Sequence, residues 1–186
     1  MSDREKEILA AYVGDNKPSS GPIELFDYDP RWPEQFHAEA SAVRAALREN
    51  VLKLEHVGST SVPGLPAKPI IDMLLVVADS ADEPAYVPAM EAAGYALRIR
   101  EPRWYEHRMF RGPRVTINLH VFSRGCVEIE RMLAFRDWLR VNQADREYYA
   151  RTKRELVQKT WKYVQNYADA KTEIVEEILR RAGPCK

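Results

Sequence analysis

The fold is decided by the stretch His56-Val-Gly-Ser-Thr-Ser-Val-Pro-Gly-Leu-Pro-Ala-Lys-Pro-Ile-Ile-Asp-Met-Leu-Leu-Val-Val77. Its first half is a turn rich in small residues, and its second half, Ile70 to Val77, is apolar enough to predict a buried strand. Gly58 lets the backbone approach a ligand closely or take a positive φ, and Ser59 and the two residues after it offer hydroxyls. Because Lys68 adds a cation, the turn suits an anionic ligand such as a polyphosphate.

Asp72 is the only ionisable residue in the predicted strand. A carboxylate among Ile, Met, Leu and Val side chains loses its hydration, which is unfavourable unless the group pairs with a cation or a metal ion. We therefore interpret Asp72 as a site residue that holds a metal or a buried ion pair. The alternative is a structural role alone.

Length and composition are those of an ordinary globular protein. The 186 residues, of which 45% are hydrophobic and 30% charged, suffice for about one domain with its own core. No apolar run reaches the roughly 18 residues of a membrane-spanning helix, and Met1 to Glu7 is charged rather than signal-like. We expect a cytoplasmic protein with no membrane partner. Cys126 and Cys185 lie far apart in the chain, so free thiols are expected.

The formal net charge is zero, which argues against a protein that coats nucleic acid through bulk electrostatics. The charges are unevenly distributed. Residues 1–97 hold twice as many acidic as basic residues, and residues 98–163 hold twice as many basic as acidic ones. Two interpretations of the basic block stay open: it faces a phosphate-bearing ligand, or its charges lie on solvated helix faces.

The chain divides into an arm and one domain. Residues 1–22 are expected to be an N-terminal arm and linker that begins with a short helix and is peripheral or partly mobile. Residues 23–186 are expected to form a single domain, and its first element is a candidate strand over residues 23–26. The sequence makes no prediction of the oligomeric state.

Strands and helices alternate in the first part of this domain, and helices follow. The predicted strands are residues 51–57, 70–77, 95–100, 104–111 and 115–122. The predicted helices are residues 33–50, residues 82–93 and, after residue 126, three segments with apolar stripes around Ile129, Tyr148 and Ile174. In the last strand Thr116, Asn118 and His120 share one face, so polar groups are presented in a row. His56 comes in at a buried face, as a core histidine or as a ligand contact.

Four segments resemble the GrpB family, which has the nucleotidyltransferase fold. They are His56 to Asp72, Asn118-Leu-His-Val-Phe122, Phe135-Arg-Asp-Trp-Leu-Arg140 and Tyr149-Ala-Arg-Thr-Lys-Arg-Glu-Leu156, and the resemblance runs from about residue 22 to residue 182. The resemblance implies an α+β fold of the polymerase-beta-like kind. In it a mixed sheet is flanked by helices, and a helical C-terminal portion closes a cleft.

The wider superfamily pattern is a Gly-Ser turn followed by two acidic residues one position apart, with a third on a later strand. Such carboxylates hold two Mg²⁺ ions that bind the triphosphate and activate the attacking hydroxyl. Here Gly58 and Ser59 match the turn and Asp72 matches the first acid, but Leu74 occupies the second position. The later strand offers His120 and other polar residues but no carboxylate.

The leading hypothesis from this resemblance is a protein that binds a nucleotide or another phosphorylated small molecule between the Gly-Ser turn and the helical half. Ser59 and Thr60 would contact phosphate, with Lys68, Lys153 and Lys171 as counter-charges. The alternative for each lysine is a surface charge.

An enzymatic form of this hypothesis is transfer of a nucleotidyl group to a small acceptor. Asp72 would then hold a metal, Mg²⁺ or Mn²⁺, and His120 would be a second ligand or a proton acceptor. A histidine ligand favours a softer ion than Mg²⁺. Two alternatives belong to other classes: a noncatalytic binding module that kept the fold, favoured by Leu74, and a protein-interaction partner.

Two weaker patterns compete with simple packing. His56, His107 and His120 with Glu106 have no metal-site spacing, so a structural zinc is not expected. The aromatic residues Trp104, Tyr105 and Phe110 alternate with the arginines Arg103, Arg108 and Arg111. This segment suits either stacking on a base or packing of core and rim, and packing is the favoured interpretation.

Overall fold

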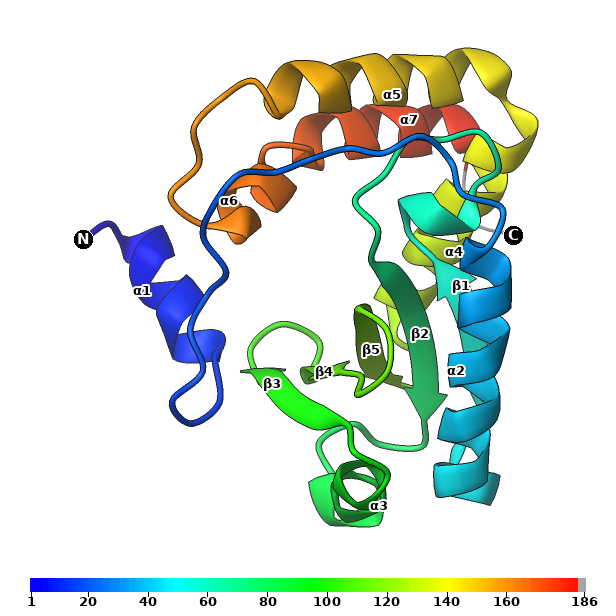
Figure 1. Ribbon diagram of the computed structural model, residues 1–186. Coiled ribbons are helices and arrows are strands. Elements are labelled where there is room, and N and C mark those ends of the chain that lie inside the picture. The colour runs from blue at the N-terminus through cyan, green and yellow to red at the C-terminus, as the bar shows by residue number, and fades with distance from the viewer. Residues whose placement is uncertain (184–186) are drawn as a thin grey trace.

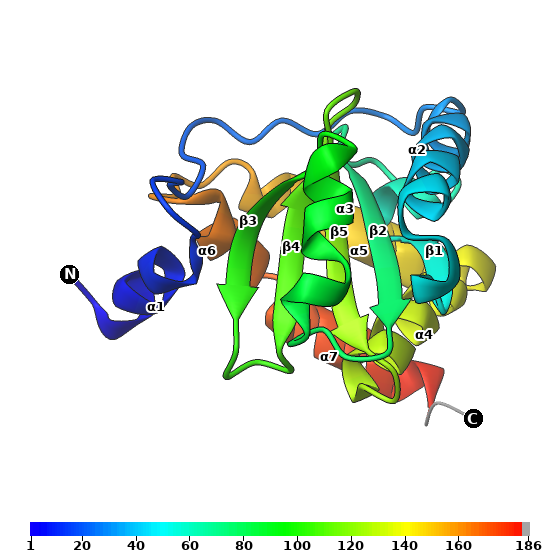
Figure 2. The same ribbon diagram turned by 90° about the horizontal axis from the view of Figure 1, so that it is seen from below.

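The chain is built around a five-stranded mixed sheet. The computed structural model describes residues 1–183. The strands are β1 (Lys53–Val57), β2 (Ile71–Val77), β3 (Ala96–Glu101), β4 (His107–Arg111) and β5 (Ile117–Ser123). Their order is β1-β2-β5-β4-β3, with β2 and β5 parallel and the other neighbours antiparallel (Figure 2). The mixed sheet and its flanking helices confirm the predicted α+β class.

Helices cover both faces of the sheet. They are α1 (Asp3–Ala11), α2 (Trp32–Leu47), α3 (Val87–Ala92), α4 (Val127–Val141), α5 (Gln143–Leu156), α6 (Val164–Asp169) and α7 (Thr172–Ala182). In Figure 2, α2 and α3 lie in front of the sheet, and α4, α5 and α7 lie behind it. Within residues 1–183, no helix combines the length and the apolar character that crossing a bilayer requires.

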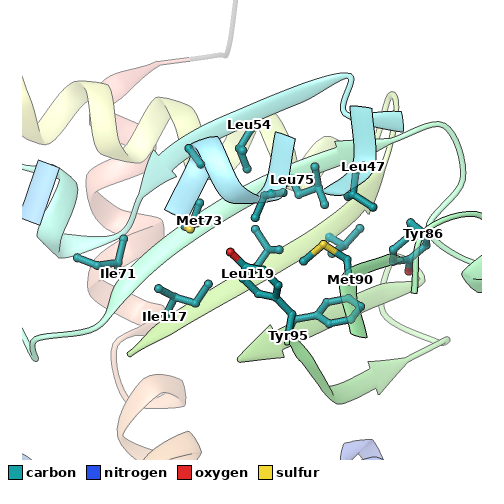
Figure 3. Packing of buried hydrophobic residues seen from close by; sticks show 14 of the residues in the cluster. Leu47, Leu54, Ile71, Met73, Leu75, Tyr86, Met90, Tyr95, Ile117 and Leu119 are labelled. Carbon is teal, nitrogen blue, oxygen red and sulfur yellow. The ribbon is translucent and has the colours of Figure 1, made fainter. Parts of the chain in front are cut away.

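The apolar run of β2 follows from burial on both faces. Met73 and Leu75 pack toward α2 and α3, in the core shown in Figure 3. Leu74 and Val76 point to the other face, where they pack with Ile129 of α4. The strand therefore has no solvent-facing side along most of its length.

A second apolar cluster joins the Gly-Ser turn, residues Gly58 to Ser61, to the helical half. Val62 and Leu65, which follow the turn, pack with Leu139 of α4, Tyr149 of α5 and Ile178 of α7. Figure 1 shows α5, α6 and α7 across the end of the sheet at which β2 begins. The turn is thus held between the sheet and the C-terminal helices.

The N-terminal arm is docked along its length. Tyr12 pairs with Ile99 of β3, and the Arg4 guanidinium forms an ion pair of 2.8 Å with Asp169 at the end of α6. Farther along, the Ser19 carbonyl accepts a hydrogen bond of 2.9 Å from the backbone N–H of Val164. The arm therefore connects the outer strand of the sheet to the helical half.

The strand predicted over residues 23–26 is wrong. The structure has a single antiparallel bridge there, made by two hydrogen bonds of 2.8 and 2.9 Å between Phe26 and Ala67. Ala67 follows Pro66, and Pro69 stands two residues later. Proline has no N–H to donate, so Pro69 cannot continue the ladder on one side, and on the other side the Leu65 N–H already donates to the Val62 carbonyl at 3.2 Å.

Other element boundaries differ by a few residues. The strand predicted from residue 104 begins at His107, because Tyr105 and Glu106 have φ angles of 54° and 50° and belong to a turn. Helix α2 stops at Leu47, where Arg48 takes a φ of 50°. Cys126 is a free thiol as predicted, and Cys185 lies outside the described residues.

Candidate functional site

The Gly-Ser turn and β2 meet where Gly58 lies against Asp72. Val57 pairs with Asp72 across β1 and β2, and Gly58 then takes a φ of +68°. A Cβ on Gly58 would overlap the Asp72 carboxylate and would lie 2.9 Å from the Asp72 Cβ. Glycine is therefore required both by the left-handed backbone and by the close approach of the acid.

Asp72 is held by polar groups of β5. The parallel register places Asn118 opposite Asp72, and the Asn118 Nδ2 donates to Asp72 Oδ1 at 2.7 Å. The His120 Nε2 lies 3.9 Å from the same oxygen. Burial raises the pKa of the Asp72 carboxyl, but His120, Asn118 and the charge of Lys68 outweigh it, so the pKa lies below its ordinary value. Asp72 is thus a carboxylate at neutral pH, with its side chain 29% exposed.

Beside Asp72, a chain of hydrogen bonds joins His120, His107 and Glu101. His120 Nδ1 lies 3.0 Å from His107 Nε2, and His107 Nδ1 lies 2.7 Å from Glu101 Oε2. Burial lowers the pKa of His107, which is 3% exposed, to about 4. His107 is therefore neutral, with its proton on Nδ1 toward Glu101 and a lone pair on Nε2.

This arrangement determines how His120 faces Asp72. Because His107 Nε2 is an acceptor, His120 donates to it from Nδ1. The other ring nitrogen, Nε2, faces the Asp72 carboxylate across 3.9 Å, which is longer than a hydrogen bond. A cation placed between them would contact both groups.

Lys153 of α5 reaches the Gly-Ser turn through the protein interior. Its Nζ donates to Ser59 Oγ at 3.0 Å and to the Pro66 carbonyl, and it lies 4.8 Å from the centre of the Tyr149 ring. The side chain is 2% exposed and forms no salt bridge with a carboxylate of the described residues. Burial first, and then the charge of Lys171, lowers the pKa of Lys153 to about 6.

Two further lysines lie over one aromatic ring. Lys68 Nζ and Lys171 Nζ are 5.9 and 4.7 Å from the centre of the Tyr167 ring. Burial and the charge of Lys171 lower the pKa of Lys68 to about 8. Burial also lowers the pKa of Lys171, against the opposing charge of Asp72. Neither lysine forms a salt bridge in the part of the chain that the structure describes.

Lys68, Lys153 and Lys171 are named here the lysine cluster, because the charge of Lys171 acts on both other lysines and Asp72 acts on Lys68 and Lys171. Arg111 of β4 adds a fourth cation, whose pKa is lowered by burial and raised by Asp72. Two buried polar atoms near these groups, Asn118 Oδ1 and Tyr167 Oη, have no hydrogen-bond partner in the described residues. Excess positive charge beside the Tyr167 hydroxyl, which can donate a hydrogen bond, is what a site for an anion requires.

Thr60 does not belong to this site. Its hydroxyl donates to the Ile70 carbonyl at 3.2 Å and lies 3.0 Å from His56 Nε2, and the residue is 1% exposed. Because the single hydroxyl proton goes to Ile70, His56 must donate to Thr60. The phosphate contact predicted for Thr60 is corrected to a structural role that ties the turn to the start of β2.

Leu74 occupies a position at which a carboxylate would be buried in the core. The side chain is fully buried between the sheet and α4, in contact with Phe122 and Ile129 among others. A second carboxylate there would point into this core. Within residues 1–183, no group of three or more His, Cys, Asp and Glu residues could hold a metal ion. The donor set therefore does not fit two Mg²⁺ ions.

The two weaker sequence patterns, the set of histidines and the aromatic and arginine segment of residues 103–111, are explained by packing. His56 stacks on Phe36 at 4.9 Å on the α2 side of the sheet, away from His107 and His120, so no zinc set is assembled. Phe110 is fully buried in the core, and Arg108 is buried and paired with Glu83 at 2.6 Å. The packing interpretation of this segment is confirmed for these two residues.

Sequence reasoning did not find the aromatic and relay groups of the site. Tyr149 and Tyr167 lie under the lysines, and Glu101 orients the histidine pair. The only local signal was one histidine in each of two predicted neighbouring strands. Their contact depends on the β4–β5 register, which pairs Met109 with His120.

Comparisons with known proteins agree on one family and one fold. The family model described as "GrpB protein" matches residues 22–181. The UPF0157 protein BH1888 of Halalkalibacterium halodurans is 60% identical over 179 residues, covering 96% of this chain and 92% of that protein. The crystal structure of conserved protein GrpB from Enterococcus faecalis has 37% identity and a TM-score of 0.75, covering 86% of this chain and 96% of that one.

A more distant likeness bears on the fold alone. The structure of Cid1 in complex with its short product ApU aligns with a TM-score of 0.52 at 10% identity, covering 69% of this chain and 42% of that one. The shared part includes most of the present chain.

Proposed function

The chain belongs to the GrpB family and has the nucleotidyltransferase-like fold, and on that premise we propose that it binds a nucleotide or another phosphorylated small molecule at the Asp72 site. The observation that carries the proposal is the lysine cluster, whose amino groups contact Ser59 or lie over the Tyr167 ring and form no salt bridge in the described residues. A phosphate group supplies the missing negative charge and accepts hydrogen bonds from ammonium groups.

Each residue has a distinct part in this proposal. Ser59 and Lys153 form one side of the phosphate site, already hydrogen-bonded to each other at 3.0 Å. Lys68 and Lys171 form the other side, where the Tyr167 ring holds both ammonium groups. Burial disfavours the charged lysines, so a bound anion regains electrostatic energy that the free protein lacks.

A single divalent cation fits the remaining donors. Asp72, the His120 Nε2 and the unpartnered Asn118 Oδ1 supply carboxylate, imidazole and amide ligands. This mixture suits Mn²⁺ better than Mg²⁺, which prefers oxygen ligands only. When bound, the cation would neutralise phosphate charge. The proposed role of His107 and Glu101 is to hold His120 in the required orientation.

Two forms of the function are favoured by different observations. His120, which lies 3.9 Å from Asp72 and is hydrogen-bonded to His107, would accept the proton of a hydroxyl, as transfer of a nucleotidyl group to a small acceptor requires. Burial of Leu74 favours a noncatalytic binding module, because the second acid is absent. The cytoplasmic location stays a prediction.

Calorimetry with a panel of nucleotides and simpler phosphates, with Mn²⁺ or with a chelator, tests binding. We expect binding that weakens at least about tenfold in Lys171→Gln, since a hydrogen bond to a charged group contributes about 1.5–3 kcal/mol. Lys159→Gln is the matched control, because Lys159 is an exposed lysine of the same helical half. Equal affinities of the two variants would contradict the proposal.

Transfer of radiolabelled nucleotide to a panel of small acceptors separates the two forms. The transferase form predicts product with Mn²⁺ and none in Asp72→Asn. The binding-module form predicts unchanged nucleotide affinity in the presence of the chelator and no product under any condition.

A further inference from the structure

A pocket lies at the free edge of the sheet, beside the Gly-Ser turn. It has a volume of about 500 Å³ and is formed where the first turns of α2 approach the end of α4 past the edge strand β1. This volume lies within the range of small-molecule sites, roughly 300–1,000 Å³. None of its lining residues belongs to the lysine cluster.

One wall of this pocket is flat and uncharged. Phe36 of α2 stacks on His56 of β1, with ring centres 4.9 Å apart and an angle of 7° between the planes. Burial lowers the pKa of His56 to about 4, and the charges of Arg140 and Arg136 also act in that direction. Tyr28 extends the aromatic surface beside this pair.

The opposite wall carries three guanidinium groups. Arg136 donates to the His56 carbonyl at 3.0 Å and to Glu55 at 2.8 Å. Arg140 donates to the Ser61 carbonyl through Nε and Nη2 at 3.0 and 2.9 Å. Asp137 pairs with Arg136 at 2.7 Å and more loosely with Arg140 at 3.5 Å.

Arg146 of α5 is the least satisfied of the three. Its Nη1 donates to the carbonyls of Leu139 and Arg140 at the end of α4, at 2.9 and 3.2 Å. In residues 1–183 it forms no salt bridge, and its Nε and Nη2 have no hydrogen-bond acceptor. A guanidinium with one edge free offers two parallel donors to a carboxylate or a phosphate.

We propose that this pocket binds a small anion carried on a planar ring, namely an aromatic carboxylate or phosphate. The ring lies on the wall of Phe36 and Tyr28, and the acid group is bound by Arg140 and Arg146. Arg136 and Arg140 also hold the carbonyls of His56 and Ser61, which flank the Gly-Ser turn. The pocket rests on residues separate from the function proposed above, and either can fail without the other.

The four histidines of the chain allow both sites to be observed at once. His37 and His56 line the pocket, whereas His107 and His120 lie at the Asp72 site. We would titrate the full chain with phenyl phosphate and follow the imidazole ¹H–¹³C signals by NMR. Methyl phosphate supplies the anion without the ring, and phenol supplies the ring without the anion.

The proposal predicts saturable shifts of the His37 and His56 NMR signals with phenyl phosphate. Methyl phosphate and phenol should bind at least about tenfold more weakly, and Arg146→Gln should weaken the binding of phenyl phosphate by a similar factor. Benzoate in place of phenyl phosphate distinguishes a carboxylate from a phosphate ligand. Arg151→Gln is the matched control, because Arg151 is an exposed arginine of the same helix. Phe36→Leu should remove the preference for phenyl over methyl phosphate while Arg146 remains.

Three outcomes would overturn the proposal. They are the absence of shifts at His37 and His56, equal affinity for the phenyl and methyl compounds, and binding that is lost in Lys171→Gln but kept in Arg146→Gln. The last result would place the ligand at the Asp72 site. Should Arg146→Gln unfold, Arg146→Lys keeps the charge without the two parallel donors and is expected to show the same loss.

Discussion

Gly58 and Asp72 form the tightest contact of the candidate site. The glycine combines a left-handed backbone with a position at which a Cβ would overlap the carboxylate, so a substitution there has two separable costs. The backbone cost is common to every glycine of positive φ. The overlap is particular to Gly58 and acts directly on the placement of Asp72.

We therefore expect Gly58→Ala to lower the free energy of unfolding by about 3 kcal/mol. Gly125 has a φ of +83°, and a Cβ added there would have no other atom within 4 Å, so Gly125→Ala isolates the backbone cost of about 1 kcal/mol. Urea unfolding of both variants measures the difference. Equal losses would show that Asp72 does not crowd Gly58.

The low pKa of Lys153 predicts that the free energy of unfolding depends on pH. Its pKa in the folded protein is about 6, against an ordinary value of 10.5, so between these values the unfolded chain binds more protons than the folded chain. Stability attributable to this residue therefore rises as pH increases from about 6 toward 10. Below pH 6 the cost of burying the charged ammonium is fully present.

Lys153→Met should thus raise the free energy of unfolding near pH 7 by about 2–4 kcal/mol, after the loss of its hydrogen bonds is included. The gain should shrink toward pH 10, where the amine of the unfolded wild-type chain also becomes neutral. Urea unfolding across this pH range measures it, with Lys159→Met as an exposed control that should change by less than about 0.5 kcal/mol. A destabilised variant with no dependence on pH would contradict the prediction.

Single residues also show what a sequence reveals about a site. Asp72 could be recognised because one acid in an apolar strand is a local anomaly. Ser59 and Thr60 look equivalent in the sequence, yet Ser59 faces Lys153 and Thr60 faces Ile70 and the His56 ring. The direction of a side chain in a tight turn depends on partners that come from other elements.

At the scale of elements, β2 and α4 decide which positions of the superfamily pattern are usable. Alternation along β2 places Asp72 and Leu74 on one face, but α4 covers only the second of them. The uncovered end of the strand holds the acid, and the covered part is core. The presence of Leu74 two residues after Asp72 is therefore explained by packing against α4. It is more than the absence of a metal ligand.

Leu74→Asp tests this directly. It restores the acid of the sequence pattern, but we expect it to lower the free energy of unfolding by about 4 kcal/mol, because a carboxylate is buried without a partner. Leu74→Met conserves volume and should cost less than about 1.5 kcal/mol. Urea unfolding and Mn²⁺ titration by electron paramagnetic resonance measure both effects. A stable Leu74→Asp protein that binds an additional Mn²⁺ would refute the assignment of Leu74 to the core.

Elements were predictable where their signal is local. The strands around the sheet follow from alternation or from apolar runs, and their existence was predicted with shifts of a few residues at the ends. The failure at residues 23–26 came from the partner segment, where Pro69 and the hydrogen bond between Leu65 and Val62 limit pairing from a distance in the sequence. The register of the strands also depends on partners that are distant in the sequence. For this reason neither the register nor the His107–His120 contact was predicted.

At the scale of the whole molecule, the candidate site lies between two parts of the chain. The sheet supplies Asp72, Asn118 and His120, and the helical half supplies Lys153 and Lys171. The apolar cluster of Val62 and Leu65 with α4, α5 and α7 holds the Gly-Ser turn between them. Of the three lysines only Lys153 lies in the basic block of residues 98–163, so the charge difference along the chain did not reveal which lysines come together.

A crystal structure of the chain with a nucleoside triphosphate and Mn²⁺ tests the proposed phosphate site most directly. We predict phosphate density within hydrogen-bond distance of Ser59 and the Lys153 Nζ, with Lys171 as a further contact and metal density beside Asp72 and His120. A site that stays filled by its own side chains, with no phosphate density near Ser59 at saturating nucleotide, would contradict it.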